Sequence, residues 1–204
     1  VDLSFLQNNF PAKGRAFHLT SLSIIDGSDA DAWADFFADQ HRVGIVTTLD
    51  PNVRPMLIAD REAYLERLWR LMNTADILKL SDEDLEWIFP NLDFDTACTA
   101  VLRQTSAKLS IVTKGAKGAI CYCNGLKVAV PAHPVPKLVD TVGAGDTFMA
   151  TVLSHLNSAD LLSQDALTGL DQATLIALLT RAAKAAAINC ECEGCQPPTA
   201  DALN

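Results

Sequence analysis

Hydrophobic positions along the chain alternate between short continuous runs and longer runs with helical spacing. Continuous or alternating apolar residues are typical of strands, whereas apolar residues that recur every three or four positions are typical of helices. On this basis we expect strands over 16–25, 43–49, 75–80, 109–113, 119–122 and 126–130. We expect helices over 28–42, 61–73, from residue 81 onward, 96–104, 144–157 and 171–188.

This order of elements predicts the fold class. Strands that alternate with helices form βαβ units, so we expect an α/β fold with a mostly parallel sheet. The run 43–49 is almost wholly apolar, as expected for a strand that is covered on both faces. The segment 123–125 (Cys-Asn-Gly) predicts a hairpin between the last two strands. Because no linker or repeat divides the 204 residues, we expect a single domain.

Charge and composition narrow the classes of partner. The chain has 25 acidic and 16 basic residues, which argues against nucleic acid or an anionic membrane as its main partner. An anionic ligand stays compatible with this balance, because backbone dipoles can hold phosphate inside an acidic protein. No apolar run approaches the roughly 18 residues of a membrane span. Six cysteines without a visible secretion signal fit reduced thiols, so we expect a cytoplasmic location.

The segment 140–148, Asp-Thr-Val-Gly-Ala-Gly-Asp-Thr-Phe, is the most informative about chemistry. Gly143 and Gly145 let the backbone approach a ligand without hindrance from a Cβ atom. The N–H groups of the first turn of the helix that follows would favour an anion. Asp146 would repel a phosphate, so its carboxylate fits a group that takes a proton from a hydroxyl as that hydroxyl attacks phosphorus. A glycine-containing loop with an Asp near a helix start is the ordinary structural alternative.

The segment 140–149 resembles the C-terminal signature of the PfkB (ribokinase-like) carbohydrate kinase family, and the order of elements follows that family. The resemblance implies a ribokinase-like three-layer α/β/α fold with a mostly parallel central sheet. It implies that Asp146 is the catalytic base. It also implies that the amides of Gly143, Ala144 and Gly145 form an anion hole for the transferred phosphoryl group.

Other segments resemble the family's nucleotide-binding elements. The segment 113–119, Thr-Lys-Gly-Ala-Lys-Gly-Ala, resembles a Thr-x-Gly loop that approaches ATP phosphates, although an ordinary strand turn would have the same residues. The ATP contacts that the resemblance implies are made by Lys79, Thr113, Gly115, Gly118, Gly145 and Asn189.

Candidate metal ligands lie in two segments. The segment 81–84, Ser-Asp-Glu-Asp, occupies the place of the family's Asn-x-x-Glu motif, which organises Mg2+ and phosphate. Asp84 is one methylene shorter than Glu, so the resemblance implies that it contacts Mg2+ through water. A helix capping box explains the same residues equally well. The resemblance further implies that Asp140 and the carbonyl of Val142 bind a monovalent cation, with K+ as the candidate.

The segment 50–55, Asp-Pro-Asn-Val-Arg-Pro, follows a buried strand, at the end of the sheet where α/β proteins bind ligands. Turn chemistry explains Pro51 and Asn52, whereas the guanidinium of Arg54 suits a phosphate or several sugar hydroxyls. The segment resembles the Asp-x-Asn-x-Arg element of fructokinase-like and 2-keto-3-deoxygluconate kinase-like members. This resemblance implies that Asn52, Arg54 and Asp146 contact the sugar.

The cysteines at the end of the chain offer a different hypothesis. Cys190, Cys192 and Cys195 could bind a soft metal, but only three thiols cluster, and reduced cysteines are the simpler interpretation. The same stretch departs from the family, whose usual Thr-Arg pair is replaced by Glu191-Cys192.

We interpret residues 1–204 as the nucleotide-binding and catalytic part of a sugar kinase that uses ATP and Mg2+, with fructose as the favoured substrate. The family comparison implies that roughly a third of a full chain, with N-terminal strands and a β lid, lies upstream of Val1. It also implies that the protein binds a small-molecule sugar and ATP, and that it forms a homodimer. One alternative is 2-keto-3-deoxygluconate kinase, in which Arg54 would bind the substrate carboxylate. The other is a non-catalytic nucleotide-binding relative, favoured by the departures at Ser81/Asp84 and Glu191-Cys192.

Overall fold

The computed structural model describes residues 2–11, 14–25 and 27–203. Its centre is a six-stranded sheet in the order β1-β2-β3-β4-β5-β6. Strands β1 to β4 pair in parallel, whereas β5 pairs antiparallel with both β4 and β6. This topology confirms the predicted mostly parallel α/β fold. The strands are β1 (Ala16–Thr20), β2 (Val46–Asp50), β3 (Ile77–Ser81), β4 (Leu109–Thr113), β5 (Ala119–Cys123) and β6 (Leu126–Val130).

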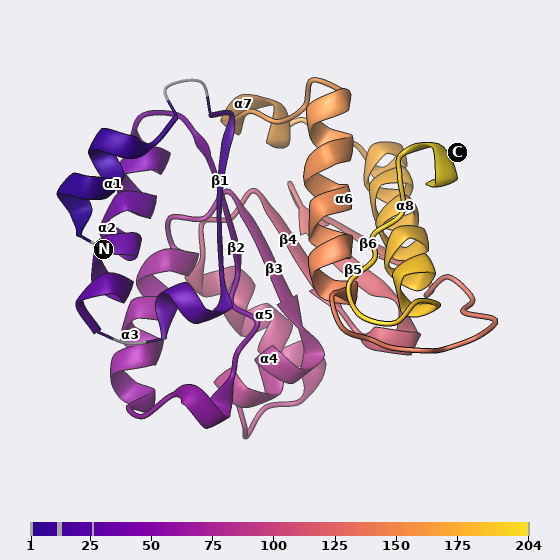
Figure 1. Cartoon of the computed structure of the whole chain (residues 1–204), viewed down its shortest axis with the longest axis horizontal. Coiled ribbons are helices and arrows are strands. Elements are labelled where there is room, and N and C mark those ends of the chain that lie inside the picture. Colours follow the sequence, from indigo (N-terminus) through magenta and orange to yellow (C-terminus); the bar gives the residue numbers. More distant parts are fainter. Residues whose placement is uncertain (1, 12–13, 26, 204) are drawn as a thin grey trace.

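Helices cover both faces of this sheet and give the three-layer arrangement (Figure 1). One face carries α2 (Gly27–Arg42), α3 (Arg61–Met72), α4 (Asp82–Ile88) and α5 (Phe94–Gln104). The other face carries α6 (Ala144–Ser158) and α8 (Gln172–Cys190), which pack against each other. The remaining helical segments are α1 (Leu3–Asn9), α7 (Gln164–Leu167), η1 (Ser21–Ile24), η2 (Pro55–Leu57), η3 (Gly115–Lys117) and η4 (Asp201–Leu203).

The alternation of side chains along the strands decides which face each residue serves. In β3, Ile77 belongs to the core under α6 and α8, whereas Leu78 and Leu80 belong to the core under α3, α4 and α5. Lys79 therefore faces α6 from within an otherwise apolar strand. In β2, Leu49 packs into the core on the opposite face, so Asp50 also faces α6.

Helix α8 has 19 residues and, among the described helices, is the one that is long and apolar enough to cross a membrane by length and composition. Leu175, Leu178 and Leu179 on this helix are fully buried against α6 and the antiparallel strands. Its apolar composition is thus that of a core helix.

The structure corrects several predicted boundaries. The first strand ends at Thr20, because Ser21 has a φ of +42° and begins a short 3-10 helix. The second strand begins at Val46 rather than Val43, because Gly44, at a φ of +87°, turns the chain after α2. The helix predicted from residue 81 onward is α4, which ends at Ile88, and the helix predicted over 96–104 is α5, which begins at Phe94. The short helices α1 and α7 were not predicted, since they present too few turns for a periodic pattern.

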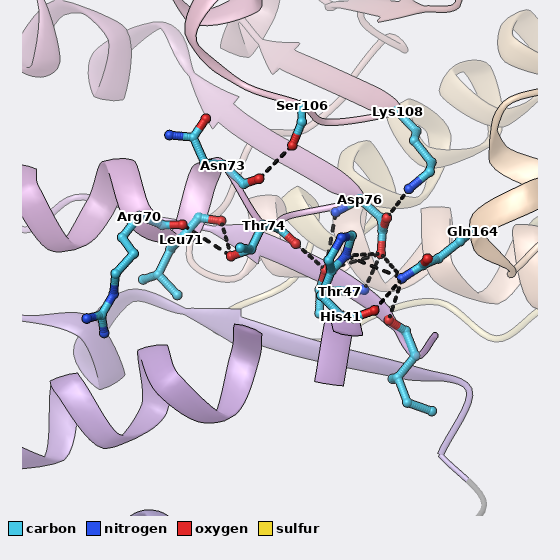
Figure 2. Close-up of polar contacts among 11 residues, drawn as sticks. His41, Thr47, Arg70, Leu71, Asn73, Thr74, Asp76, Ser106, Lys108 and Gln164 are labelled. Carbon is cyan, nitrogen blue, oxygen red and sulfur yellow. Dashed lines mark hydrogen bonds and ion pairs between the residues drawn. The ribbon is translucent and has the colours of Figure 1, made fainter. Parts of the chain in front are cut away.

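A buried carboxylate joins the amino ends of three parallel strands (Figure 2). Asp76 precedes β3 and is 0% exposed. Its Oδ2 accepts hydrogen bonds from the backbone N–H of Thr47 (2.9 Å) and from Nε2 of Gln164 (3.3 Å), and lies 3.3 Å from Nδ1 of His41. Its Oδ1 pairs with Nζ of Lys108, which precedes β4. Both oxygens thus have partners, and these interactions connect β2, β3, β4, α2 and α7.

We predict that Asp76→Asn lowers the free energy of unfolding by about 3 kcal/mol, because it removes one partner of a buried ion pair. The matched control is Asp95→Asn, since Asp95 pairs with Lys127 (3.7 Å) but its side chain is 79% exposed. Exposed pairs contribute only about 0–1 kcal/mol. Denaturant unfolding of both variants checks the prediction, and equal small losses in the two would contradict it.

Candidate active site

The glycine-rich segment forms the start of α6 at the carboxyl ends of the parallel strands. Gly143 is the N-cap residue, with a φ of +75°. The N–H of Ala144 donates to the carbonyl of Thr141 (3.2 Å), and that of Thr147 donates to the carbonyl of Gly143 (2.8 Å). The amides between them, of Gly145 and Asp146, are first-turn N–H groups without an intrahelical partner. These two amides are open to an anion at this helix start, and the anion hole of Gly143, Ala144 and Gly145 implied by the resemblance stays a prediction.

A buried ion pair lies directly below this helix start. The register of β2 and β3 pairs Leu49 with Leu78, which places Asp50 beside Lys79. Nζ of Lys79 is 2.8 Å from Oδ2 of Asp50, and the two side chains are only 5% and 2% exposed. A Cβ atom on Gly145 would lie 3.6 Å from Nζ of Lys79, so the ammonium faces the open side of the glycine turn. Lys79 is therefore brought to the predicted anion site.

Burial and neighbouring charges act on the ionisable groups around this pair. Burial raises the pKa of Asp50, although the Lys79 ammonium opposes that shift. Burial also lowers the pKa of His18, and the carboxylates of Asp50 and Asp146 oppose this. The imidazole of His18 lies 2.7 Å, Nδ1 to Oγ1, from Thr48 on the adjacent strand. Asp146 itself is an exposed residue in the first turn of α6.

The carboxylate of Asp84 forms hydrogen bonds to two segments at the same edge of the sheet. Its Oδ1 accepts the N–H of Val53 (2.8 Å), and its Oδ2 accepts the N–H of Ser81 (2.8 Å). The hydroxyl of Ser81 in turn accepts the N–H of Asp84 (3.0 Å), which completes a capping box on α4. Asp84 thus holds the Asp50–Pro55 segment against the start of α4. Its contact with Mg2+ stays a prediction.

Two of the three predicted sugar contacts, Asn52 and Arg54, lie in the turn after β2, where Asn52 is half-buried and Arg54 is exposed. Asn52 has a φ of +41°, and its carbonyl accepts a hydrogen bond from the hydroxyl of Ser21 (3.3 Å). Nη1 of Arg54 donates to Oδ1 of Asn52 (2.5 Å), so the guanidinium lies back over its own turn. Val53, between them, is held by Asp84. The two polar side chains are therefore together, at the end of the strand that also carries Asp50.

The predicted nucleotide loop joins β4 to β5. Gly115 and Gly118 have φ values of +49° and +90°, so both adopt the left-handed backbone region. A Cβ atom on Gly118 would lie 2.1 Å from the carbonyl oxygen of Val130, which leaves room for glycine alone. Nζ of Lys114 lies over the ring of Phe94 at 5.1 Å, and the Thr113 hydroxyl contacts the carbonyl of Leu80 (3.4 Å). The loop is thus built as a tight turn, and its ATP contacts stay predictions.

A third segment, after α8, closes against the glycine turn. Oδ1 and Oδ2 of Asp140 accept the N–H groups of Val142 and Gly194 (both 3.0 Å), and these hydrogen bonds lower the pKa of Asp140. The carbonyl of Val142 accepts Nδ2 of Asn189 (2.8 Å), whose Oδ1 accepts the N–H of Gln196 (2.8 Å). The three predicted residues Asp140, Val142 and Asn189 are therefore one network.

The cysteines do not form the alternative metal site. Among the described residues, no group of three or more His, Cys, Asp or Glu side chains is placed to hold a metal ion. Cys190 is buried, Cys192 is half-buried and Cys195 is exposed, all as free thiols. Cys195 instead packs on the glycine turn, because a Cβ atom on Gly143 would lie 2.4 Å from its Sγ.

A separate groove of about 570 Å³ runs along the outer side of α8. Ile176, Thr180, Lys184, His133 and Leu203 are among its lining residues. The six residues predicted to contact ATP are not part of its lining.

The sequence missed Asp50 as a functional candidate. Its segment resembles a sugar-binding element, but only Asn52 and Arg54 of that segment are predicted to contact the sugar. The available signal is a pair of opposite charges, with Asp50 directly after one predicted buried strand and Lys79 inside the next. Neighbouring parallel strands bring such positions together, so two lone charges of opposite sign predict a buried pair.

Comparisons with known proteins identify one family over nearly the whole chain. The pfkB family carbohydrate kinases match residues 3–202. A fructokinase of Rhizobium leguminosarum bv. trifolii is 38% identical over 160 residues, which are 78% of this chain and 48% of the relative. A fructokinase of Salmonella typhimurium is 31% identical over 159 residues, 76% of this chain and 51% of the relative. The chain thus spans about half the length of these curated relatives.

Two solved structures share the fold over nearly the whole chain. A fructokinase from Xylella fastidiosa with bound ATP has a TM-score of 0.85 at 26% identity, covering 96% of this chain and 61% of that one. A fructokinase from Vibrio cholerae O395, in a form with fructose, ADP and calcium ion bound, has a TM-score of 0.83 at 25% identity. That match covers 100% of this chain and 63% of the Vibrio chain.

We predict that Gly143→Ala lowers the free energy of unfolding by about 1–3 kcal/mol more than Gly44→Ala does, because the added methyl collides with Cys195. Gly44, at a φ of +87°, is the matched control, since a Cβ there meets nothing within 4 Å and only the backbone strain remains. Adding Cys195→Gly to Gly143→Ala should recover the difference. Denaturant unfolding measures all three, and an equal loss in the two single variants would refute the contact.

Proposed function

Since the chain belongs to the pfkB family of carbohydrate kinases, we propose that it supplies the nucleotide-binding and catalytic part of an ATP-dependent sugar kinase, with fructose as the acceptor. One observation carries this proposal. The carboxylate of Asp146 stands in the same helical turn as two open amides, and that turn lies on the buried ammonium of Lys79. A proton acceptor and an anion site are thereby adjacent.

This arrangement suits phosphoryl transfer to an alcohol. Asp146 takes the proton of the sugar hydroxyl while that oxygen forms a bond to the γ-phosphorus of ATP. The bond from the γ-phosphorus to its bridging oxygen breaks, and ADP leaves with the electron pair. The amides of Gly145 and Asp146 and the ammonium of Lys79 face the negative charge that spreads over the transferred group. An exposed carboxylate suits the role of Asp146, because it is available to an entering hydroxyl.

The cation sites differ in how well the residues fit them. Both oxygens of Asp84 accept backbone N–H groups and the residue is buried, which favours a positioning role over direct ligation of Mg2+. In this proposal Mg2+ stays with the nucleotide phosphates, as is common in kinases. Each oxygen of Asp140 also accepts one backbone N–H, but this residue is only half-buried. The remaining lone pairs of Asp140 and of the Val142 carbonyl are hard oxygen donors that fit a monovalent cation such as K+.

The choice of sugar rests on the relatives and on the turn after β2. The fructokinases described above favour fructose. Arg54 and Asn52 present polar groups at the exposed end of β2, where sugar hydroxyls can be recognised. The guanidinium of Arg54 would equally bind a carboxylate, so 2-keto-3-deoxygluconate is the second candidate acceptor. Because the chain spans about half of its relatives, the acceptor is proposed for the whole protein.

Further expectations accompany the kinase proposal. The edge strand β1 pairs with β2 alone among the described strands, which is compatible with additional N-terminal strands beside it. The six free thiols are compatible with a cytoplasmic location. A homodimer stays a prediction from the family resemblance.

We predict that Asp146→Asn lowers kcat by roughly 10²–10⁴-fold, because the amide cannot accept the hydroxyl proton. The affinity for ATP should change little, since the amides and Lys79 are intact. Asp165→Asn is the matched control, as Asp165 is also an exposed first-turn acid, on α7. Steady-state ADP release with fructose and calorimetric ATP binding test this prediction in the whole protein. An unchanged kcat would remove Asp146 from the mechanism.

A further inference from the structure

In the described part of the chain, two buried aspartates, Asp76 and Asp50, each pair with a lysine, one at each end of the parallel strands. At the amino ends, Asp76 pairs with Lys108 and uses both carboxylate oxygens in hydrogen bonds (Figure 2). At the carboxyl ends, Asp50 pairs with Lys79, and only its Oδ2 is bonded. A buried polar atom normally finds a partner, so the difference between the two pairs calls for an explanation.

The open oxygen shows that the Asp50 pair is not optimised for stability. Asp50 is 1% exposed, and its Oδ1 has no hydrogen-bond partner among the described residues. Its register partner on β1, Thr20, likewise keeps a buried hydroxyl without a partner. A buried ion pair with unsatisfied atoms contributes little to stability, because the loss of hydration offsets the attraction between the charges. The presence of this pair is therefore better explained by where it lies than by a contribution to stability.

That position is the underside of the anion site. Lys79 has three N–H donors, and one of them bonds to Asp50. The ammonium contacts the turn at Gly145, within reach of a group bound at the open amides. A long lysine side chain samples many rotamers unless a partner holds it. The carboxylate of Asp50, at 2.8 Å from Nζ, is such a partner.

We propose that Asp50 is a positioning residue for phosphoryl transfer, whose buried carboxylate holds the Lys79 ammonium against Gly145 so that its charge faces the transferred group. This inference rests on the proposed kinase function and adds a residue that acts through Lys79. Asp50 does not touch the substrate, because its side chain is covered by the fold. Its effect is to keep the lysine in place.

The split between kcat and KM provides a readout that a purely structural role would not move. The groups that surround the pair are His18 on β1, Asp84 on α4 and Asp146 on α6. When Asp50 becomes Asn, the Lys79 ammonium loses the charged partner that holds it at 2.8 Å. Stabilisation of the transferred group should then fall, while the sugar contacts stay intact.

The test compares four forms of the whole protein with fructose and ATP. We expect Asp50→Asn to lower kcat by about 10–100-fold and to change the KM for fructose less than about threefold. Lys79→Met should lose at least as much in kcat. The double variant should lose no more than Lys79→Met alone, because Asp50 acts through Lys79. Asp76→Asn is the control, with kcat unchanged while it is folded.

The outcomes separate this inference from the proposed function. If the unsubstituted protein shows no sugar-dependent ADP release, both proposals fall. If it turns over fructose but Asp50→Asn keeps its kcat, or the losses of the two single variants multiply in the double variant, the positioning role is wrong and the kinase stands. Should Lys79→Met fail to fold, the kcat and the KM of Asp50→Asn decide by themselves.

Discussion

The left-handed turn at Gly143 is the constraint on which the rest of the site depends. Its φ of +75° lets the chain arrive from Asp140 and enter α6 with two amides open toward the carboxyl ends of the strands. The side chain of Cys195 fills the space that a Cβ atom on Gly143 would take, and the Lys79 ammonium lies below Gly145. The anion site and the last segment of the chain are therefore built around the same two glycines.

The two buried aspartates that pair with lysines differ in their roles. The Asp76 carboxylate has partners from four segments on its two oxygens, as a structural centre requires. The Asp50–Lys79 pair is more fully buried, because Lys108 beside Asp76 is 24% exposed, but it is less satisfied. It lies at the end of the sheet where open α/β folds bind ligands. The difference follows from the parallel topology, which places the starts of the strands together at one edge and their ends at the other.

The sequence predicted the fold class and most elements because their hydrophobic periods are strong. It missed short α1 and α7 and misplaced the start of β2, where a single positive-φ glycine, Gly44, outweighed the apolar pattern. For the site, the spacing of the glycines and Asp146 predicted an anion-binding helix start. Contacts between distant segments could not be predicted: Asp84 with Val53, Asn189 with Val142, and Cys195 with Gly143. Such contacts depend on the packing of loops, which leaves no periodic signal in the sequence.

The proposed transfer of the γ-phosphoryl group from ATP to a sugar belongs to the whole protein of which this chain is part. It is tested most directly by ADP release by the whole protein with ATP and Mg2+, compared across fructose, 2-keto-3-deoxygluconate, ribose and no sugar. We expect turnover that depends on the sugar and is fastest with fructose. Measurable ATP binding without turnover on any of these sugars would contradict it, and would favour the non-catalytic nucleotide-binding relative instead.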